Sequence, residues 1–329
     1  MHQTLTSPTI SIIVEWENAI LAGDQVAYAM LDRLSEESRS LENVSEVRFV
    51  FDPAVVDVGE FKSLVTSRIA PQRYGNKPLN VVFQAVEGLH YYEYKNAGAS
   101  ASTMDIVAFL DSDSLPDPGW LQDLTAPLRA DSTCMASAGS THVAPGGSYD
   151  AAFAAGWIFP LPADIRPTRY TPYFFANNVA FRRSFLIDNP FPQMSRGVTR
   201  GACASLSKKM AADNKKISFQ PGARAWHPPP NGFNHFVTRA LAHGRDEAYN
   251  ASSANWVTRL GQIGVALGRI VVAPVRTAFR IARNRRQLNA GLLAPITGAG
   301  VMLAYATLQC AGLLIALTAP GVARHSWKI

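Results

Sequence analysis

The stretch that most constrains the fold is a short apolar run followed at once by acidic residues. Residues 106–110 read IVAFL, and residues 111–120 read DSDSLPDPGW. A β-branched and aromatic run without polar alternation is typical of a strand that is covered on both faces, as in a parallel sheet. Asp111, Asp113 and Asp117 then follow the carboxyl end of this strand. Ligands of open α/β sheets bind at that edge, so the sequence places its acidic cluster where a binding site is expected.

Similar apolar runs recur along the first part of the chain and are separated by segments long enough for helices. They are TISIIV at 9–14, VRFVF at 47–51 and LNVVFQ at 79–84. Residues 19–41 carry the clearest helical pattern, with Asn18 as the expected N-cap. Residues 173–186 predict a strand that leads into a helix, and residues 217–230 predict two short strands ended by prolines. Strands that alternate with helices predict an α/β fold with a doubly wound, mostly parallel sheet.

Charge is distributed unevenly along the chain. There are 31 Lys and Arg against 25 Asp and Glu, a net charge of +6. Nine of the basic residues, and none of the acidic ones, lie within residues 248–329. Such a basic segment could bind nucleic acid or a membrane. Its arginines are few for their apolar surroundings, so the composition favours membrane lipids as a partner and argues against nucleic acid.

The pattern beyond residue 255 is typical of membrane-associated helices. Four arginines share an arc of roughly 60° on a helix and apolar residues occupy the remainder, as in a helix that lies in a bilayer interface. These are Arg269, Arg276, Arg280 and Arg283. Residues 287–323 then contain no charged side chain, and about 20 such residues suffice to cross a bilayer. A buried hydrophobic helix is the alternative for this run.

We therefore predict two regions, a globular domain over residues 1–250 and a basic helical region over 251–329 that is interfacial or transmembrane. One span and an interfacial hairpin are both compatible with the glycines and prolines at 291–300. The arginines at 280–286 precede the apolar run, which predicts an inner-membrane protein whose first domain faces the cytoplasm. No secretion signal precedes the first strand, and three widely spaced cysteines favour a reducing compartment.

Five stretches resemble the motifs of family 2 glycosyltransferases with the GT-A fold, in the same order and spacing. They are IIVEWENA at 12–19, FDP at 51–53, YKNAGASAS at 94–102, FLDSDSLPDPGWL at 109–121 and FFANNVAFRRSFL at 174–186. The resemblance covers roughly residues 9–245, and its most specific part is the acidic strand with the Pro-x-x-Gly-Trp-Leu that follows. It implies a Rossmann-like GT-A sheet, a nucleotide-diphosphate sugar as the donor and a divalent metal, Mn²⁺ or Mg²⁺.

The resemblance also implies roles for single residues. Asp113 would be the direct metal ligand, Asp111 would lie nearer the ribose and share the metal, and His227 would be a third ligand or a phosphate contact. Carboxylate oxygens are ligands that suit Mg²⁺ or Mn²⁺. The nucleotide-sugar site would comprise Glu15, Asn18, Asp52, Lys95, Asn96 and Asp111. Alternatives are a turn-forming role for Asp52, a solvated Lys95 and a structural His227.

The acceptor side would comprise Asn177, Asn178, Arg182, Arg196 and Arg200. Two features depart from the family pattern. The first strand ends in Val-Glu-Trp-Glu-Asn instead of Pro-x-Tyr-Asn, so recognition of the base is expected to differ. Residues 195–210 lack the carboxylate that would deprotonate an acceptor hydroxyl. Asp117 and Asp188 are the substitute candidates for this base.

Two functions of different classes fit these features. The first is a hexosyltransferase at the membrane that passes sugar from the donor to a lipid-linked or membrane glycan acceptor, in polysaccharide or glycolipid biosynthesis of the cell envelope. A lipid phosphate as acceptor is already anionic and needs no base, and Arg196 and Arg200 would suit it. The second is a noncatalytic nucleotide-sugar-binding subunit of an assembly complex. A nucleotidyltransferase would require a glycine-rich basic loop, which EWENAILAGDQ at 15–25 does not supply.

Overall fold

The computed structural model describes residues 7–69, 73–74, 77–194, 198, 200–250, 256–325 and 327. Contacts divide the chain into two compact units. The first comprises Met1–Thr141, Ile165–Gln193 and Ala202–His227, and the second comprises His142–Asp164, Met194–Gly201 and Pro228–Ile329. Two earlier segments and the chain after residue 227 thus group with the C-terminal helices, whereas the sequence suggested a single boundary at residue 250.

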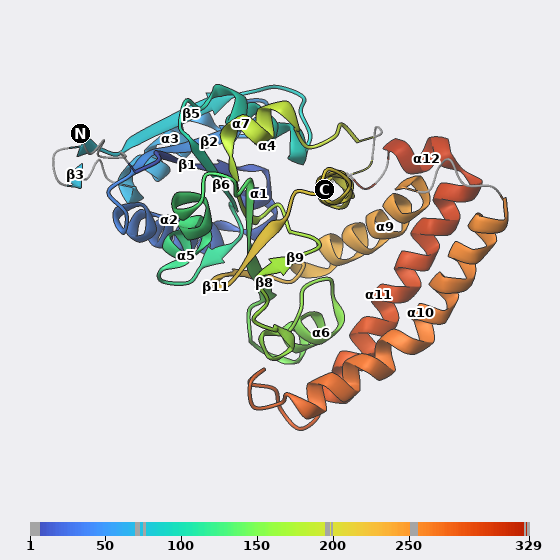
Figure 1. Ribbon diagram of the computed structural model, residues 1–329. Helices are drawn as coiled ribbons and strands as arrows, with labels where there is room; N and C mark the ends of the chain where they lie inside the picture. The colour runs from blue at the N-terminus through green and yellow to red at the C-terminus, as the bar shows by residue number, and fades with distance from the viewer. Residues whose placement is uncertain are drawn as a thin grey trace. The chain divides into compact units, whose positions relative to one another are not determined.

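The first unit is built on a mixed sheet with the strand order β5-β2-β1-β6-β10-β8-β11-β7, and β9 pairs with β11. The strands are β1 (Ile10–Glu15), β2 (Val44–Phe51), β5 (Asn80–Ala85), β6 (Ile106–Asp111), β7 (Leu115–Pro116), β8 (Ala136–Val143), β9 (Tyr170–Thr171), β10 (Asn178–Arg182) and β11 (Ile217–His227). The strands β5, β2, β1 and β6 are parallel, and β10 is antiparallel to β6. The predicted α/β fold is confirmed (Figure 1).

Helices of the first unit cover this sheet. They are α1 (Glu17–Ala22), α2 (Asp24–Arg39), α3 (Val58–Arg68), α4 (Tyr91–Ala101), α5 (Trp120–Ala130), α7 (Arg183–Asp188) and α8 (Ala202–Ala212), and β3 (Arg73–Tyr74) and β4 (Lys77–Pro78) pair separately. Side chains of a strand alternate between its faces. Ile12 and Val14 therefore point to the core that α2 and α5 complete, while Ile13 meets α4 at Gly98, where a Cβ would lie 2.6 Å from the Ile13 Cγ2.

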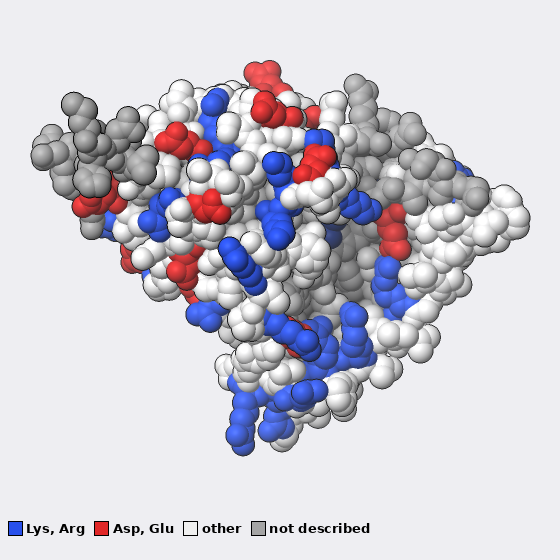
Figure 2. All heavy atoms as spheres, in the orientation of Figure 1, with Lys and Arg blue, Asp and Glu red and all other residues white. Residues whose placement is uncertain are grey.

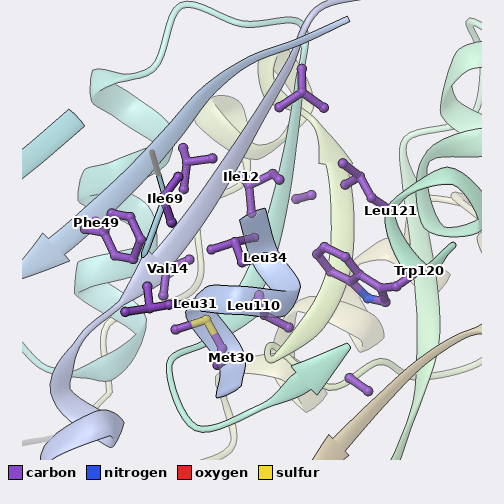
Figure 3. Packing of buried hydrophobic residues seen from close by; sticks show 14 of the residues in the cluster. Ile12, Val14, Met30, Leu31, Leu34, Phe49, Ile69, Leu110, Trp120 and Leu121 are labelled. Carbon is purple, nitrogen blue, oxygen red and sulfur yellow. The ribbon is translucent and has the colours of Figure 1, made fainter. Parts of the chain in front are cut away.

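The core beneath α2 and α5 fixes the site-bearing edge of the sheet. Figure 3 shows Leu31 and Leu34 of α2 against Val14 of β1, with Leu110 of β6 and Trp120 of α5 in the same cluster. All five side chains are fully buried. Each such side chain contributes roughly 1.5–3 kcal/mol of hydrophobic free energy relative to exposure. The ends of β1 and β6 are thus held firmly next to each other.

Two local predictions are wrong. The helical pattern of residues 19–41 is broken by Gly23, whose φ of 92° separates α1 from α2. Asn18 lies inside α1 and not at an N-cap, a position that Trp16 occupies. Residues 217–227 form one strand, β11, because Pro221 is accommodated within it and does not end it. The first error arises because Gly23 acts as a helix breaker within an otherwise continuous apolar pattern, and the second because the pairing of β11 in the sheet overrides the breaker signal of Pro221.

The second unit is helical. It contains α6 (Ser148–Gly156), the short 3₁₀ helix η1 (Pro162–Asp164), α9 (Gly232–Asn250), α10 (Trp256–Arg283), α11 (Ala294–Thr318) and α12 (Pro320–His325). In Figure 1, α10 and α11 lie side by side, and α11 also packs on α9 and α6. Among the described residues, α11 is the one helix long and apolar enough to cross a membrane, by length and composition.

Helix α10 exposes several apolar side chains, while two of its arginines are partly buried. Val271, Val275 and Phe279 are 69%, 68% and 66% exposed. The side chains of Arg269 and Arg280 are only 31% and 23% exposed, and they pair with Glu247 and Asp164. A surface helix usually turns its apolar face toward the core, and α10 departs from that pattern at Val271, Val275 and Phe279.

Helices α9 and α11 cross with their backbones in contact. A Cβ on Gly244 of α9 would overlap the carbonyl of Gln309, and a Cβ on Gly312 of α11 would overlap the carbonyl of Leu241. Neither neighbour can move aside, because both are backbone atoms of helices. The pair of glycines therefore sets the distance between these helices, as small residues do in tightly packed helix pairs.

We expect Gly312→Ala to destabilise the second unit. The added methyl group forces α9 and α11 apart, and overpacking of this kind costs about 1–3 kcal/mol. Gly300→Ala on the same helix is the matched control, since a Cβ there meets open space and the change raises helix propensity. Thermal unfolding of the full chain in detergent should show a lowered melting temperature for Gly312→Ala alone. Equal melting temperatures for the two variants would contradict the close crossing.

Candidate active site

The carboxyl ends of β1 and β6 bring two acidic residues side by side. Glu15 and Asp111 are partners in the parallel register of the two strands. The Asp111 carboxylate accepts hydrogen bonds from Lys95 Nζ at 2.6 Å and from the Tyr91 hydroxyl at 2.7 Å. Asn18 Nδ2 also donates to it, at 3.3 Å. The side chain of Lys95 is fully buried and that of Asp111 is 5% exposed, so this is a buried ion pair at the sheet edge.

The acidic side chains of this edge outnumber the cations that face them. The Glu15 carboxylate is fully buried and accepts hydrogen bonds from the Glu17 N–H at 2.9 Å and from Asn18 Nδ2 at 2.8 Å. Burial, and then the charge of Asp111, hold the pKa of Glu15 well above its usual value. Burial together with Asp52 and Asp111 raises the pKa of Glu17 to about 7. The site therefore favours an added positive charge, such as a cation or a proton.

Asp113 and His227 meet at the same edge. Asp113 Oδ2 lies 3.2 Å from His227 Nε2, and their side chains are 5% and 6% exposed. Asp113 follows β6, whereas His227 ends β11, so the sheet unites residues more than a hundred positions apart. Adjacent ligands of a six-coordinate metal at about 2.1 Å are about 3 Å apart. The spacing of this carboxylate and imidazole therefore fits two neighbouring positions in the coordination shell of Mn²⁺ or Mg²⁺.

The predicted set of three metal ligands is not assembled in this structure. Among the described residues, no group of three or more His, Cys, Asp and Glu side chains is placed to hold a metal. The carboxylate of Asp111 is engaged by Lys95 and Tyr91 instead. Asp113 and His227 thus remain as candidate ligands, and oxygens of a bound diphosphate would have to complete the shell.

The other residues predicted at the nucleotide-sugar site have varied surroundings. Asp52 accepts from the Ala54 N–H at 2.8 Å and from the Gly88 N–H at 3.1 Å, which is the turn-forming arrangement. Asn96 exchanges two hydrogen bonds with the backbone of Phe191, at 2.9 and 3.0 Å. Its side chain therefore holds the loop after α7. Asn18 and Glu15 do lie at the edge, bonded to each other and, through Asn18, to Asp111.

Residues predicted on the acceptor side hold the sheet together. Asn178 accepts from the indole N–H of Trp120 at 2.8 Å and donates to the carbonyl of Ala223 at 2.9 Å. Asn177 accepts from the Thr141 hydroxyl at 3.1 Å. The Arg182 guanidinium donates to two backbone carbonyls at the end of α5 and just after it. Arg200 belongs to the second unit, and Arg196 lies outside the described residues.

The two candidate bases have different positions. Asp117 pairs with Arg224 Nε at 2.7 Å and accepts from the Trp226 indole N–H at 2.6 Å, which joins the β7 end to β11. Asp188 is an exposed residue at the end of α7. The carboxylate of Asp117 is therefore committed to two donors, and that of Asp188 is open to solvent. Of the segment 195–210, residues 195–197 and 199 lie outside the described residues.

Two contributors to the site escaped the sequence reasoning. Tyr91 lies one helical turn before Lys95 on α4, a spacing that places both on the same face and could have revealed it. Glu37 of α2 accepts from the backbone N–H groups of Gly119 and Leu121 at 2.8 and 2.9 Å. It thereby fixes the start of α5 at Trp120. Nothing in the local sequence around Glu37 indicates this role.

The comparisons with known proteins agree with this architecture. Residues 69–186 match the model of the glycosyl transferase family 2, and the matched region contains β6, Asp111 and Asp113. The pre-mycofactocin glycosyltransferase of two Mycobacterium tuberculosis strains is 25% identical over 274 residues, which cover 74% of this chain and 55% of the relative. The chain thus spans about half the length of the curated relatives it matches.

One solved structure supports the fold over most of the chain. It is a mannosyltransferase from Pyrobaculum calidifontis in complex with GDP-Man and Mn²⁺, with a TM-score of 0.53, 16% identity and coverage of 94% of this chain and 88% of that chain. The sheet order and this likeness define the GT-A fold. The family model matches residues 69–186, so this part of the chain is similar to glycosyl transferase family 2.

Proposed function

We propose that the chain is a metal-dependent glycosyltransferase that moves a sugar, a hexose, from a nucleotide-diphosphate donor to a lipid-linked or membrane-proximal acceptor. The observation that carries the proposal is the Asp113–His227 pair at the edge of the sheet, beside the Lys95–Asp111 ion pair. A carboxylate and an imidazole at this spacing suit Mn²⁺ or Mg²⁺. The solved mannosyltransferase with the same fold was studied with Mn²⁺ and GDP-Man, which supports a donor of this class.

The residues of the site would have different roles in the transfer. Asp113 and His227 would hold the metal, which neutralises charge on the departing diphosphate when it is bound. Lys95, Tyr91 and Asn18 fix the Asp111 carboxylate in one orientation, so that it can accept hydrogen bonds from donor hydroxyl groups. Because the orientation of the Asp111 carboxylate is fixed before the donor binds, this side chain needs little rearrangement during the transfer.

Two features of the second unit support the proposal that the acceptor lies in or near a membrane. The exposed apolar side chains of α10 and the charge-free α11 suit a lipid environment. An anionic lipid phosphate would attack without a general base. This agrees with the structure at Asp117, because the carboxylate of this candidate base is already bonded to Trp226 and Arg224. We further propose that the chain is attached to the inner membrane with its first unit in the cytoplasm, because the arginines before α11 follow the pattern of cytoplasmic flanks.

A noncatalytic nucleotide-sugar-binding subunit is the second candidate. The observation that favours it is the lack of a carboxylate in residues 195–210, where family members commonly carry the base. This candidate shares the donor site of the first but predicts no turnover with any acceptor. The relatives named as pre-mycofactocin glycosyltransferases favour transfer.

Release of nucleoside diphosphate from a panel of UDP- and GDP-sugars distinguishes the two candidates. The purified full chain is assayed with Mn²⁺ or with EDTA, and with or without a membrane lipid extract. A transferase should release nucleoside diphosphate from one donor in a metal-dependent reaction that increases with the lipid extract. Tight donor binding without release under any lipid condition would instead establish the binding subunit.

A further inference from the structure

The second unit contains a cavity of about 530 Å³ that the proposed sugar transfer does not use. It is formed by α9, α10, α11 and the residues that follow α6. His243, Tyr305 and Trp157 line its polar part, and all three are largely buried. The Trp157 indole N–H donates to the Tyr305 hydroxyl at 3.2 Å, and that hydroxyl lies 2.9 Å from His243 Nδ1.

One ring nitrogen of His243 lacks a partner. Among the described residues, no group forms a hydrogen bond with the buried Nε2 atom. The Tyr305 hydroxyl already accepts from Trp157, so its own proton is best used toward Nδ1, which leaves the proton of a neutral imidazole on Nε2. Burial, followed by the charges of Arg200, Arg239 and Arg269, holds the pKa of His243 well below its usual value and keeps the ring neutral. His243, a residue of the cavity wall, thus carries a buried N–H donor that lacks an acceptor among the described residues.

The charges around the cavity favour an anion. Arg269 and Glu247 both line it, and they neutralise each other in a two-point ion pair at 2.8 and 3.1 Å. Arg276 is an exposed lining residue that adds a positive charge. Lys and Arg also gather where α10 ends and the chain turns toward α11 (Figure 2), a stretch that contains Arg280, Arg283, Arg285 and Arg286. An anionic group would satisfy both Arg276 and the His243 donor.

The rim of the cavity is apolar. Ile158, Val265 and Val272 line it and are 46%, 61% and 59% exposed. The two valines are exposed residues of α10. A small inorganic ion would leave this apolar surface uncovered, whereas an amphiphile would cover it and remove it from water, which is favourable. The combination points to a ligand with an anionic head and a hydrocarbon chain.

We propose that this cavity binds the phosphate-bearing headgroup of an anionic lipid, with the phosphate at Arg276 and at His243 Nε2, a buried atom that a small movement of the ring would expose to it, and the chain along Val265 and Val272. The inference goes beyond the proposed sugar transfer and requires no donor. Free phosphate shares the headgroup chemistry, but it offers nothing to the apolar rim. A lipid held in this way would connect α9, α10 and α11 to the bilayer at one defined position.

Titration calorimetry on the full chain in detergent tests the proposal. The probes are dihexanoyl-phosphatidylglycerol, dihexanoyl-phosphatidylcholine and inorganic phosphate. The phosphatidylglycerol should bind most tightly, and Arg276→Gln should weaken it by at least tenfold, because a charge-assisted hydrogen bond is lost. The matched control is Arg283→Gln, which removes the same charge from an exposed position of α10 outside the cavity. That variant should lose no more than about fivefold, the effect of one general surface charge.

A second pair of variants separates the hydrogen bond from folding. His243→Gln retains an N–H donor and should keep most of the affinity, whereas His243→Phe retains the ring shape and should lose it. Equal losses in Arg276→Gln and Arg283→Gln would overturn the proposal in favour of general electrostatic attraction. Inorganic phosphate that binds as tightly as the lipid would overturn the lipid assignment. These outcomes do not depend on nucleoside diphosphate release, so failure of the transfer proposal is recognised separately.

Discussion

Asp113→Asn is expected to lower metal-dependent release of nucleoside diphosphate by about 100-fold or more, a loss typical of removing a group that stabilises transition-state charge. The amide is nearly the same size as the carboxylate and can still bond to His227, so the fold should persist. What the variant loses is the anionic oxygen that would hold the cation. Steady-state release with Mn²⁺, together with thermal unfolding, measures both effects.

Asp123→Asn provides the matched control for this substitution. It makes the same chemical change on the exposed surface of α5, ten residues along the chain. It should retain the rate of the native protein. EDTA should reduce the native rate to that of Asp113→Asn and should have little further effect on that variant. A variant that kept a full Mn²⁺-dependent rate would show that the metal is held elsewhere.

Lys95→Met is expected to destabilise the first unit by about 3 kcal/mol or more, because removing one partner of a buried ion pair leaves the other charge uncompensated. Lys95 and Asp111 are both almost completely buried, and Glu15 adds a second carboxyl next to them. Methionine matches the length of the lysine stem, so the loss reflects charge more than volume. Urea unfolding followed by far-UV circular dichroism measures the change.

Combining Lys95→Met with Asp111→Asn should restore most of the lost stability. The double variant removes both charges and leaves a neutral side-chain amide at position 111 to bond with Tyr91 and Asn18. A double-mutant cycle then isolates the coupling between the two side chains. Unfolding of Lys95→Met at the same urea concentration as the native chain would contradict the buried ion pair.

The sheet and the edge that carries the candidate site could be predicted because each strand is indicated by residues that are adjacent in the sequence. The runs at 9–14, 47–51, 79–84 and 106–110 correspond to β1, β2, β5 and β6, since an apolar run of this length has few alternatives to a buried strand. The parallel order then places the ends of β1 and β6 at one edge. The position of Asp111 and Asp113 at this edge follows from the strand order and requires no knowledge of side-chain contacts.

The partners of the polar side chains could not be predicted in the same way. Asn178, Arg182 and Asn96 occur in motif-like stretches, but their hydrogen bonds go to backbone groups 45 to 95 residues away. A sequence motif indicates that a residue lies near the site and leaves open whether its side chain faces a ligand or the protein. The pairing of Asp113 with His227 likewise required the resemblance to a family as well as the residue pattern.

The hydrogen bonds of Glu37 have a consequence for attempts to transplant the acidic loop. Its carboxylate, on α2, holds the N–H groups of Gly119 and Leu121, more than eighty residues further along the chain. The conformation of the segment DSDSLPDPGW and of the helix start that follows it therefore depends on a residue outside the segment. Grafted into another α/β scaffold without an anion at this position, the segment would keep its sequence and lose the contacts that fix the start of α5. A graft would have to carry α2 with it.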